Sequence, residues 1–281
     1  DVYFGGSEHA TGHLLYSRFY QKFLYDLKLL NKDEYAKKLI NQGMILGNSA
    51  FIYRKSGTSE YISKNLISDF KIDKIRIDIK YVKGEDQINV DLLKKEDKDF
   101  KNSVFIKEND NFLCVREQEK MSKSKFNVVN PDEICNQYGA DTLRMYEMFL
   151  GPIEQSKPWD TRGISGVHSF LKKFWNLFFQ DGNIYLSDEE PSKESLKSLH
   201  KTIKKVSEDI EKLSLNTCIS SFMICINELS SMKCNNRLIL ENLLILISPF
   251  APHFAEELWN QIGNSKSIVD EKYPEFQERY L

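Results

Sequence analysis

The chain has 281 residues, which is enough to bury a sizeable core and favours a division into two domains. Lys and Arg number 39 against 41 Asp and Glu, so the net charge of -2 excludes a strongly basic protein, although a local patch rather than the total decides contact with nucleic acid. The 5 cysteines are odd in number and form no Cys-x-x-Cys pair, which favours reduced thiols in the cytoplasm. We find no signal peptide and no apolar run long enough to cross a bilayer, so we expect a cytoplasmic chain without membrane contact.

The amino-terminal residues predict a βα unit. Residues 1–6 form a short run that ends at Gly5 and Gly6, which is typical of a strand followed by a tight turn. Ser7 is a suitable N-cap for the helix that follows. That helix is indicated by apolar residues spaced by four positions, namely Leu15, Phe19, Phe23 and Leu27.

Polar side chains gather at the start of this predicted helix. Glu8 falls in its first turn, and His9 and His13 share one face. A carboxylate can accept hydrogen bonds from sugar hydroxyls, and two imidazoles can form a flat wall with a polar edge. An ordinary pair of helix histidines is the plain alternative. A metal pair would need a third ligand, and no His-Glu-x-x-His frame is present, so we predict no metal site.

Residues 39–47 predict a second short, buried strand that Gly47 closes. Two strands joined by a helix imply a parallel sheet, which binds ligands at the carboxyl ends of its strands. A plain core strand is the alternative for residues 41–45. From residue 48 to residue 116 the pattern changes to strict alternation of apolar and charged residues, most clearly at Ile75, Ile77, Ile79 and Tyr81.

The alternating segment predicts a small antiparallel β insert with one solvated face and no catalytic constellation. Residues 104–107 and 112–114 flank a polar tetrapeptide, which indicates a hairpin. After the insert, the run Glu119 to Lys125 alternates lysines with small hydroxyl residues. Lysine is a flexible point charge and serine both donates and accepts, so such a loop can follow a polyphosphate through a reaction. A solvated charge run is the alternative.

The remaining residues predict an all-α region. Asn130 and Glu133 form a capping box around Pro131, at the start of a helix that we expect to run to residue 138. We expect Asp141 to cap the following helix, and apolar spacing predicts another helix over residues 164–178. Apolar residues then step by three and four from residue 196 onward, which predicts a bundle of about four helices. In this bundle the prolines at 249 and 252 separate two helices, and we expect a structural role for the histidine at 253.

The order of residues in the lysine-rich loop carries more information than its composition. Lys120-Met121-Ser122-Lys123-Ser124 resembles the second signature of class I aminoacyl-tRNA synthetases. The following strings, Asn-Val-Val-Asn-Pro-Asp and Tyr-Gly-Ala-Asp-Thr-Leu-Arg, make the longer stretch similar to leucyl-tRNA synthetase. Residues 248–259 resemble the anticodon-binding bundle of the same class. Phe126 departs from the pattern, because many relatives carry glycine after the signature.

The resemblance implies roles for particular residues. The signature residues 120–124 would be catalytic, with Lys123 meeting the departing pyrophosphate and Lys120 supporting closure of the loop. ATP and Mg²⁺ would be the cofactors, and Lys123 would also bind ATP. Gly6 and Glu8 would hold the adenosine ribose, whereas His9 and His13 would line the leucine pocket. The adenine would meet Gln42, Met44 and Ile45.

The resemblance also implies a division of the chain and a fold class, α/β followed by all-α. Residues 1–47 would be the second half of a Rossmann-like catalytic domain, and residues 48–116 the β-rich insert. Residues 117–158 would hold the signature loop and connecting helices, and residues 159–281 a helical anticodon-binding domain. The implied activity is that of a leucine–tRNA ligase, which forms leucyl-adenylate from ATP and leucine and passes the leucyl group to tRNA(Leu).

No His-x-Gly-His signature is present, and the chain opens without an initiator methionine, so we expect a fragment or a subunit. Its further partner would be the missing N-terminal half, on the same chain or a split one, and the chain alone would be inactive. Two alternatives stay open from the residues. The first is a non-catalytic tRNA-binding module, and the second is an isoleucyl or valyl relative.

Overall fold

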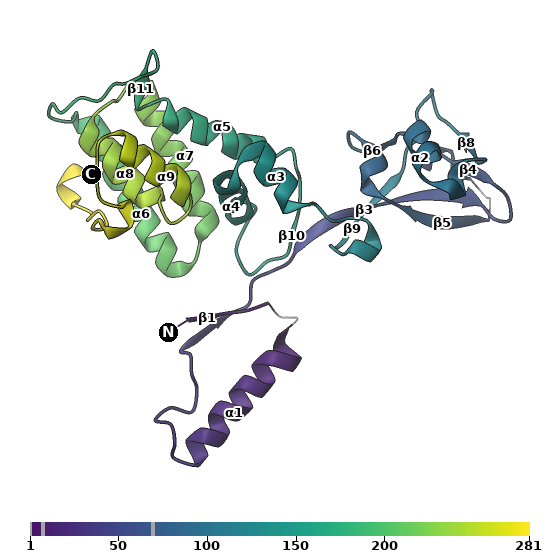
Figure 1. Ribbon diagram of the computed structural model, residues 1–281, viewed down its shortest axis with the longest axis horizontal. Coiled ribbons are helices and arrows are strands. Elements are labelled where there is room, and N and C mark those ends of the chain that lie inside the picture. Colours follow the sequence, from purple (N-terminus) through teal and green to yellow (C-terminus); the bar gives the residue numbers. More distant parts are fainter. Residues whose placement is uncertain (1, 7–8, 69–70) are drawn as a thin grey trace. The chain divides into compact units, whose positions relative to one another are not determined.

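The computed structural model describes residues 2–6, 9–68 and 71–281, which form two compact units (Figure 1). The first unit comprises residues 1–42, 130–155 and 160–281. The second comprises residues 43–129 and 156–159. No helix within the described ranges is both long enough and apolar enough to cross a membrane.

The amino-terminal residues form the predicted βα arrangement. Strand β1 (Val2–Phe4) pairs in parallel with β2 (Lys38–Ile40), and helix α1 (Leu15–Asp26) lies between them in sequence. A π-helical turn, Ala10–Leu14, precedes α1. No residue of α1 is buried, and its large apolar side chains are exposed, among them Leu15, Tyr16, Phe19, Tyr20 and Phe23. The predicted N-cap Ser7 lies outside the described residues.

The prediction of one strand over residues 39–47 is wrong. Strand β2 ends at Ile40, and a second strand, β3 (Ile45–Lys55), begins after four residues without regular structure. The prediction joined the two strands because apolar residues lie on both sides of Asn41 and Gln42, although these two polar residues mark the break. Gly47 lies inside β3 rather than closing a strand, and β3 belongs to a different sheet from β2.

Strand β3 is the centre of the second unit (Figure 1). Along its edges, β9 (Val115–Lys120), β5 (Ile72–Ile77) and β4 (Glu60–Ile62) are antiparallel to it, and β10 (Lys157–Pro158) is parallel. Strand β8 (Val104–Ile106) is parallel to β4. The sheet is therefore mixed, where the sequence predicted an antiparallel one. A short ribbon, β6 (Val82–Lys83) with β7 (Gln87–Ile88), completes the strands of the insert.

The predicted hairpin over residues 104–114 is also wrong. The turn exists, because Glu108 and Asn111 exchange backbone hydrogen bonds of 2.8 Å, but β8 pairs with β4 instead of with residues 112–114. The fully buried ring of Phe112 packs edge-on against Phe105, with centroids 4.9 Å apart. Core packing of Phe112 therefore takes precedence over local pairing.

The segment predicted as a β insert also contains a helix, α2 (Val90–Glu96). Asn89 starts it, because its side chain accepts a hydrogen bond of 3.3 Å from the Leu92 amide. Apolar alternation over so few residues does not distinguish a strand from a helix that follows a cap.

The two faces of the central sheet have different chemistry. On one face of β3, Ala50 and Ile52 are fully buried in the apolar core of the insert. Cys114 belongs to the same core, and burial raises the pKa of its thiol to about 11. The other face carries Gly47, Ser49 and Phe51, since successive side chains of a strand point to opposite faces.

The first unit contains the predicted helical bundle. Helices α3 (Pro131–Tyr138), α4 (Ala140–Phe149) and α5 (Ile164–Trp175) precede it. Asn130 caps α3 by accepting a 3.0 Å bond from the Asp132 amide. The bundle consists of α6 (Lys193–Lys212), α7 (Leu215–Ser231), α8 (Arg237–Ile247) and α9 (Pro252–Gln261). The predictions of these four helices and of the proline break between the last two are confirmed. A small ribbon, β11 (Phe179–Gln180) with β12 (Asn183–Ile184), joins α5 to α6.

Asp141 caps a different helix from the one predicted. Gly139, with φ of 88°, is the N-cap of α4, and Asp141 lies inside the first turn. Its buried carboxylate instead accepts hydrogen bonds from the Phe254 amide at 2.6 Å and from Nδ1 of His253 at 2.9 Å. Asp141 thus satisfies the first turn of α9, and this contact supports the structural role predicted for His253.

We expect Asp141→Ala to lower the free energy of unfolding by about 1–3 kcal/mol, because it leaves the α9 amide without its acceptor. Denaturant unfolding of the chain measures this change. His253→Ala removes only the imidazole contact and should cost less than Asp141→Ala, since the His253 side chain is 78% exposed and the Phe254 amide keeps its acceptor. Equal midpoints for Asp141→Ala and the parent would contradict the capping role.

Candidate active site

The signature residues form a compact turn at the end of a strand. Strand β9 runs to Lys120, and a single 3-10 turn spans Lys123–Lys125. Phe126 then adopts the left-handed conformation, with φ of 51° and ψ of 35°, which costs a non-glycine residue about 1 kcal/mol. Its carbonyl accepts a 3.1 Å hydrogen bond from the Ile79 amide, so the insert contributes to holding this geometry.

Asn127 closes the turn. Its side chain is fully buried, and its Oδ1 accepts a 2.9 Å hydrogen bond from the Ser122 amide. Its Nδ2 donates to Ser49 Oγ at 2.9 Å and to the Lys120 carbonyl at 3.4 Å. Both ends of the turn are therefore tied to one buried amide, and through Ser49 to β3.

The turn lies directly on β3 at Gly47. A Cβ atom at this position would be 2.4 Å from the Asn127 carbonyl oxygen and 2.9 Å from Met121 Cγ. Such distances are well inside van der Waals contact, so the close approach requires the absence of a side chain. Gly47 thus fixes how near the signature turn comes to the sheet.

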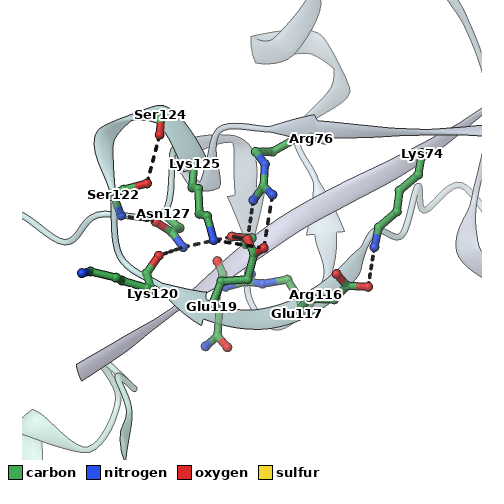
Figure 2. A network of polar contacts seen from close by, with 12 residues as sticks. Lys74, Arg76, Arg116, Glu117, Glu119, Lys120, Ser122, Ser124, Lys125 and Asn127 are labelled. Carbon is green, nitrogen blue, oxygen red and sulfur yellow. Dashed lines mark hydrogen bonds and ion pairs between the residues drawn. The ribbon is translucent and has the colours of Figure 1, made fainter. Parts of the chain in front are cut away.

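A charged cluster holds one flank of the turn (Figure 2). The Glu119 carboxylate accepts hydrogen bonds from Arg76 Nη1 at 2.5 Å and Nη2 at 3.3 Å, from Ser49 Oγ at 2.5 Å, and from Lys125 Nζ at 3.3 Å. The Arg76 hydrogen bonds, followed by that of Ser49, lower the pKa of Glu119 to about 2. Glu119 is therefore ionised at every pH at which the protein would work.

The other two lysines of the turn are placed differently. Lys120 and Lys123 are exposed, and within residues 2–6, 9–68 and 71–281 neither ammonium makes an ion pair or a side-chain hydrogen bond. Figure 2 shows the Lys120 ammonium pointing away from the charged cluster. The hydroxyls of Ser122 and Ser124 lie 3.1 Å apart in the same turn. Free ammonium groups beside hydroxyls suit a polyanionic ligand.

The depressed pKa of Glu119 gives a testable pH dependence. Its contacts stabilise the folded state above the ordinary pKa of 4.5 and are lost as the pH falls through about 2. We expect the carboxyl carbon of Glu119 to titrate near pH 2 by NMR. In Arg76→Met the midpoint should move upward toward 4.5, because the largest cause of the depression is gone. An unchanged midpoint in this variant would contradict the assigned cause.

The predicted nucleotide and leucine residues at the amino terminus lie in the first unit. Gly6 is buried, and its carbonyl accepts a 3.0 Å hydrogen bond from the His9 amide. His13 hydrogen-bonds through Nε2 to the Tyr3 hydroxyl, and the two rings stack with centroids 5.7 Å apart. This contact between His13 and Tyr3 was not predicted from the sequence. Glu8 lies outside the described residues.

Of the predicted adenine-binding residues, Ile45 begins β3, whereas Gln42 and Met44 lie in the irregular segment before it. Gln42 is exposed, and Ile45 pairs with Lys157 of β10. Both backbone groups of Met44 are occupied, since its amide donates to Ser156 Oγ at 3.2 Å and its carbonyl accepts from the Lys157 amide at 2.9 Å. Met44 and Ile45 belong to the same unit as the signature turn. Among the described residues, no group of three His, Cys, Asp or Glu side chains could hold a metal ion.

Comparison with known families identifies this arrangement. Residues 88–159 match the family described as tRNA synthetases class I (I, L, M and V), and residues 192–281 match the anticodon-binding domain of tRNA ligase. The first match includes the signature turn and the second includes α6 to α9. The chain therefore belongs to the class I tRNA synthetases.

Within that class the similarity is to one group of enzymes over the whole chain. The leucine–tRNA ligase of Christiangramia forsetii is 58% identical over 281 residues, and that of Bacteroides thetaiotaomicron is 52% identical over 282 residues. The chain belongs to the leucine–tRNA ligase family. It is covered completely in both comparisons but spans 29% and 30% of these two relatives.

A solved structure gives the same result. The agnB2 LeuRS of Agrobacterium radiobacter K84, crystallised as a ternary complex with tRNA and LeuAMS, matches the chain with a TM-score of 0.64 and 26% identity. The match covers 100% of this chain and 30% of that protein.

Proposed function

We propose that this chain supplies part of a leucine–tRNA ligase, which activates leucine with ATP and transfers the leucyl group to tRNA(Leu). The observation that carries the proposal is the signature turn of a family-matched segment, in which Lys120 and Lys123 are exposed and form no ion pair with any described residue. The relatives' names favour leucine over isoleucine or valine.

In the activation step the leucine carboxylate attacks the α-phosphate of ATP and pyrophosphate leaves. No side chain need act as a nucleophile, so the protein contributes positioning and electrostatic stabilisation. Lys123 is the group that we assign to the departing pyrophosphate, and Lys120 assists from the end of β9. Ser122 and Ser124 offer hydroxyls to the phosphate oxygens.

Mg²⁺ is the implied metal, and it would share the negative charge of the phosphates. Mg²⁺ in enzymes that act on ATP is usually held by substrate phosphates, water and one or two carboxylates rather than by an all-protein cage. The chain's own residues would act on the phosphates by fixed positive charge.

The remaining site residues keep the roles that the resemblance implies. Gly6 and Glu8 would hold the ribose, His9 and His13 would line the leucine pocket, and residues 42–45 would meet the adenine. The parallel pair of β1 and β2 with α1 supports a Rossmann-like origin for the amino-terminal segment. Because both Met44 backbone groups are engaged, adenine contact through this residue would use its side chain.

The exposed surface of α1 supports a further partner. Its leucine, phenylalanine and tyrosine side chains are uncovered, and the first curated relatives are more than three times as long as this chain. The remaining part of the protein, in the same chain or in a separate subunit, would cover these side chains of α1. The proposal also includes the division of the chain into four parts, with boundaries after residues 47, 116 and 158.

The test combines the chain with the remaining part of a relative and measures ATP–pyrophosphate exchange. Exchange with leucine, and little with isoleucine or valine, is the expected result. Exchange with isoleucine or valine instead would reassign the substrate. No exchange, together with measurable tRNA binding, would replace the ligase by a non-catalytic tRNA-binding module. The chain alone serves as the control, and we expect it to give no exchange.

A further inference from the structure

We propose that Glu119 and Lys125 are positioning residues. Together with Arg76 of the β insert, they hold the signature turn in a fixed place on the sheet. Lys125 thus differs in role from Lys123, although both are lysines of one turn. This inference rests on the proposed function and deepens it, since it names what aims the lysine that meets the phosphates.

The register of the central sheet places the necessary groups on one face. Gly47 is paired with Glu119 and Ser49 with Glu117 across β3 and β9. Phe51 is paired with Arg76 across β3 and β5. Residues directly opposite one another in an antiparallel pair share a face. The face opposite the insert core therefore carries Gly47, Ser49, Phe51, Lys74, Arg76, Glu117 and Glu119.

The Arg76–Glu119 contact is held rigidly. The Arg76 guanidinium meets both carboxylate oxygens of Glu119 and also lies over the Phe51 ring, 4.5 Å from its centroid. Ser49 Oγ donates a further hydrogen bond to the same carboxylate. A bidentate pair with an additional donor leaves Glu119 little rotational freedom. Glu119 can therefore act as a fixed anchor point beside the turn.

Lys125 fastens the turn to this anchor. Its ammonium lies 3.3 Å from Glu119 Oε1, and its side chain is partly buried. Residues two apart in a 3-10 helix project about 120° apart around the helix axis, because the helix has about three residues per turn. Fixing Lys125 against the sheet therefore turns Lys123 away from it, into solvent. The charge of Lys125 is matched locally by Glu119, whereas that of Lys123 is left for a ligand.

The same face of the sheet contains a matched control. Lys74 and Glu117 form an ion pair of 2.5 Å, and the Lys74 ammonium lies 4.0 Å from the Phe51 centroid. This pair has the same charges, the same strands and the same aromatic neighbour as Arg76 and Glu119. Among the described residues, however, neither Lys74 nor Glu117 forms a hydrogen bond or an ion pair with the signature turn (Figure 2). Removal of this pair reports the cost of losing a charged pair on this face.

The experiment uses the chain combined with the remaining part of the protein and measures ATP–pyrophosphate exchange. We expect Glu119→Gln and Lys125→Met each to lower kcat about 10-fold, with the KM for leucine unchanged, because a misdirected lysine reduces transition-state stabilisation. The double variant should also lose about 10-fold rather than about 100-fold, since both changes break one contact. Glu117→Gln should stay within about 2-fold of the parent, and Arg76→Lys should retain more activity than Arg76→Met.

Hydrogen exchange of the amides of residues 123–126 supplies a second measurement, which does not depend on catalysis. Glu119→Gln should accelerate it in the ligand-free protein, and Glu117→Gln should leave it unchanged. Multiplicative losses in the double variant, or equal effects of the Glu117 and Glu119 variants, would overturn the inference. If Lys123→Ala keeps the full rate of ATP–pyrophosphate exchange, the proposed function fails instead. Hydrogen exchange of the amides then still decides whether Glu119 anchors the turn.

Discussion

Replacing Lys123 by alanine should lower leucine-dependent ATP–pyrophosphate exchange by roughly 30- to 1000-fold. This corresponds to about 2–4 kcal/mol in the activation barrier, the scale observed when one preorganised donor is removed from a transition state. The ammonium is exposed and makes no ion pair among the described residues, so no partner inside the chain offsets its loss. Because Lys123 contributes few folded-state contacts, the free energy of unfolding should change little.

The measurement compares exchange rates of parent and variant in the chain combined with the remaining part of the protein. Lys101→Ala is a suitable control, since Lys101 is an exposed lysine next to a 3-10 turn, as Lys123 is an exposed lysine within one, but Lys101 lies in the insert. Binding of tRNA should be the same in all three proteins. Equal exchange rates for Lys123→Ala and the parent would end the assignment of this lysine to pyrophosphate.

Gly47→Ala should reduce exchange about 100-fold, because the new methyl group would meet the Asn127 carbonyl oxygen at 2.4 Å and must lift the turn from β3. The obstacle is backbone rather than the end of a flexible side chain, so a rotamer change cannot relieve it. Overpacking of this kind also lowers the free energy of unfolding by about 1–3 kcal/mol. Exchange kinetics and denaturant unfolding measure the two effects.

Gly166→Ala is the matched control for Gly47→Ala. Gly166 lies inside α5, and nothing is within 4 Å of the Cβ that alanine would add. Alanine is the better helix former, so this variant should gain about 0.5–1 kcal/mol and keep full exchange. If Gly47→Ala matches the parent in both measurements, the turn does not depend on close contact with β3.

The helices were predictable because their signals are local. Helix α3 begins at Pro131 and ends beside Gly139, as the capping residues indicated, and α6 to α9 follow the apolar spacing. The β insert was less predictable because strand pairing joins distant residues. Whether β8 pairs with the next segment or with β4 depends on where Phe112 packs, and no local pattern contains that information.

The candidate site shows the same division between local and distant signals. The order of residues 120–124 predicted the signature turn. The residues that hold this turn in place were not predicted. Ser49 and Asn127 are separated by 78 positions, and Arg76 and Glu119 by 43. One signal was available: acidic residues alternate in β9 and basic residues alternate in β5, as expected for strands that flank a common neighbour. The prediction that Asp141 caps its own helix was wrong for the same reason, because its hydrogen-bond partners lie on α9.

The shared pairing of β3 and β9 limits how this family can change length during evolution. A single-residue insertion or deletion within residues 46–51 or 115–120 would shift the pairing by one residue and turn the Glu119 carboxylate away from the face that carries Ser49 and Arg76. Changes by two residues would keep its orientation but displace it along the strand. We expect length changes to be tolerated in loops of the insert away from this pairing, such as the turn at residues 108–111, and not in β5, whose Arg76 holds Glu119.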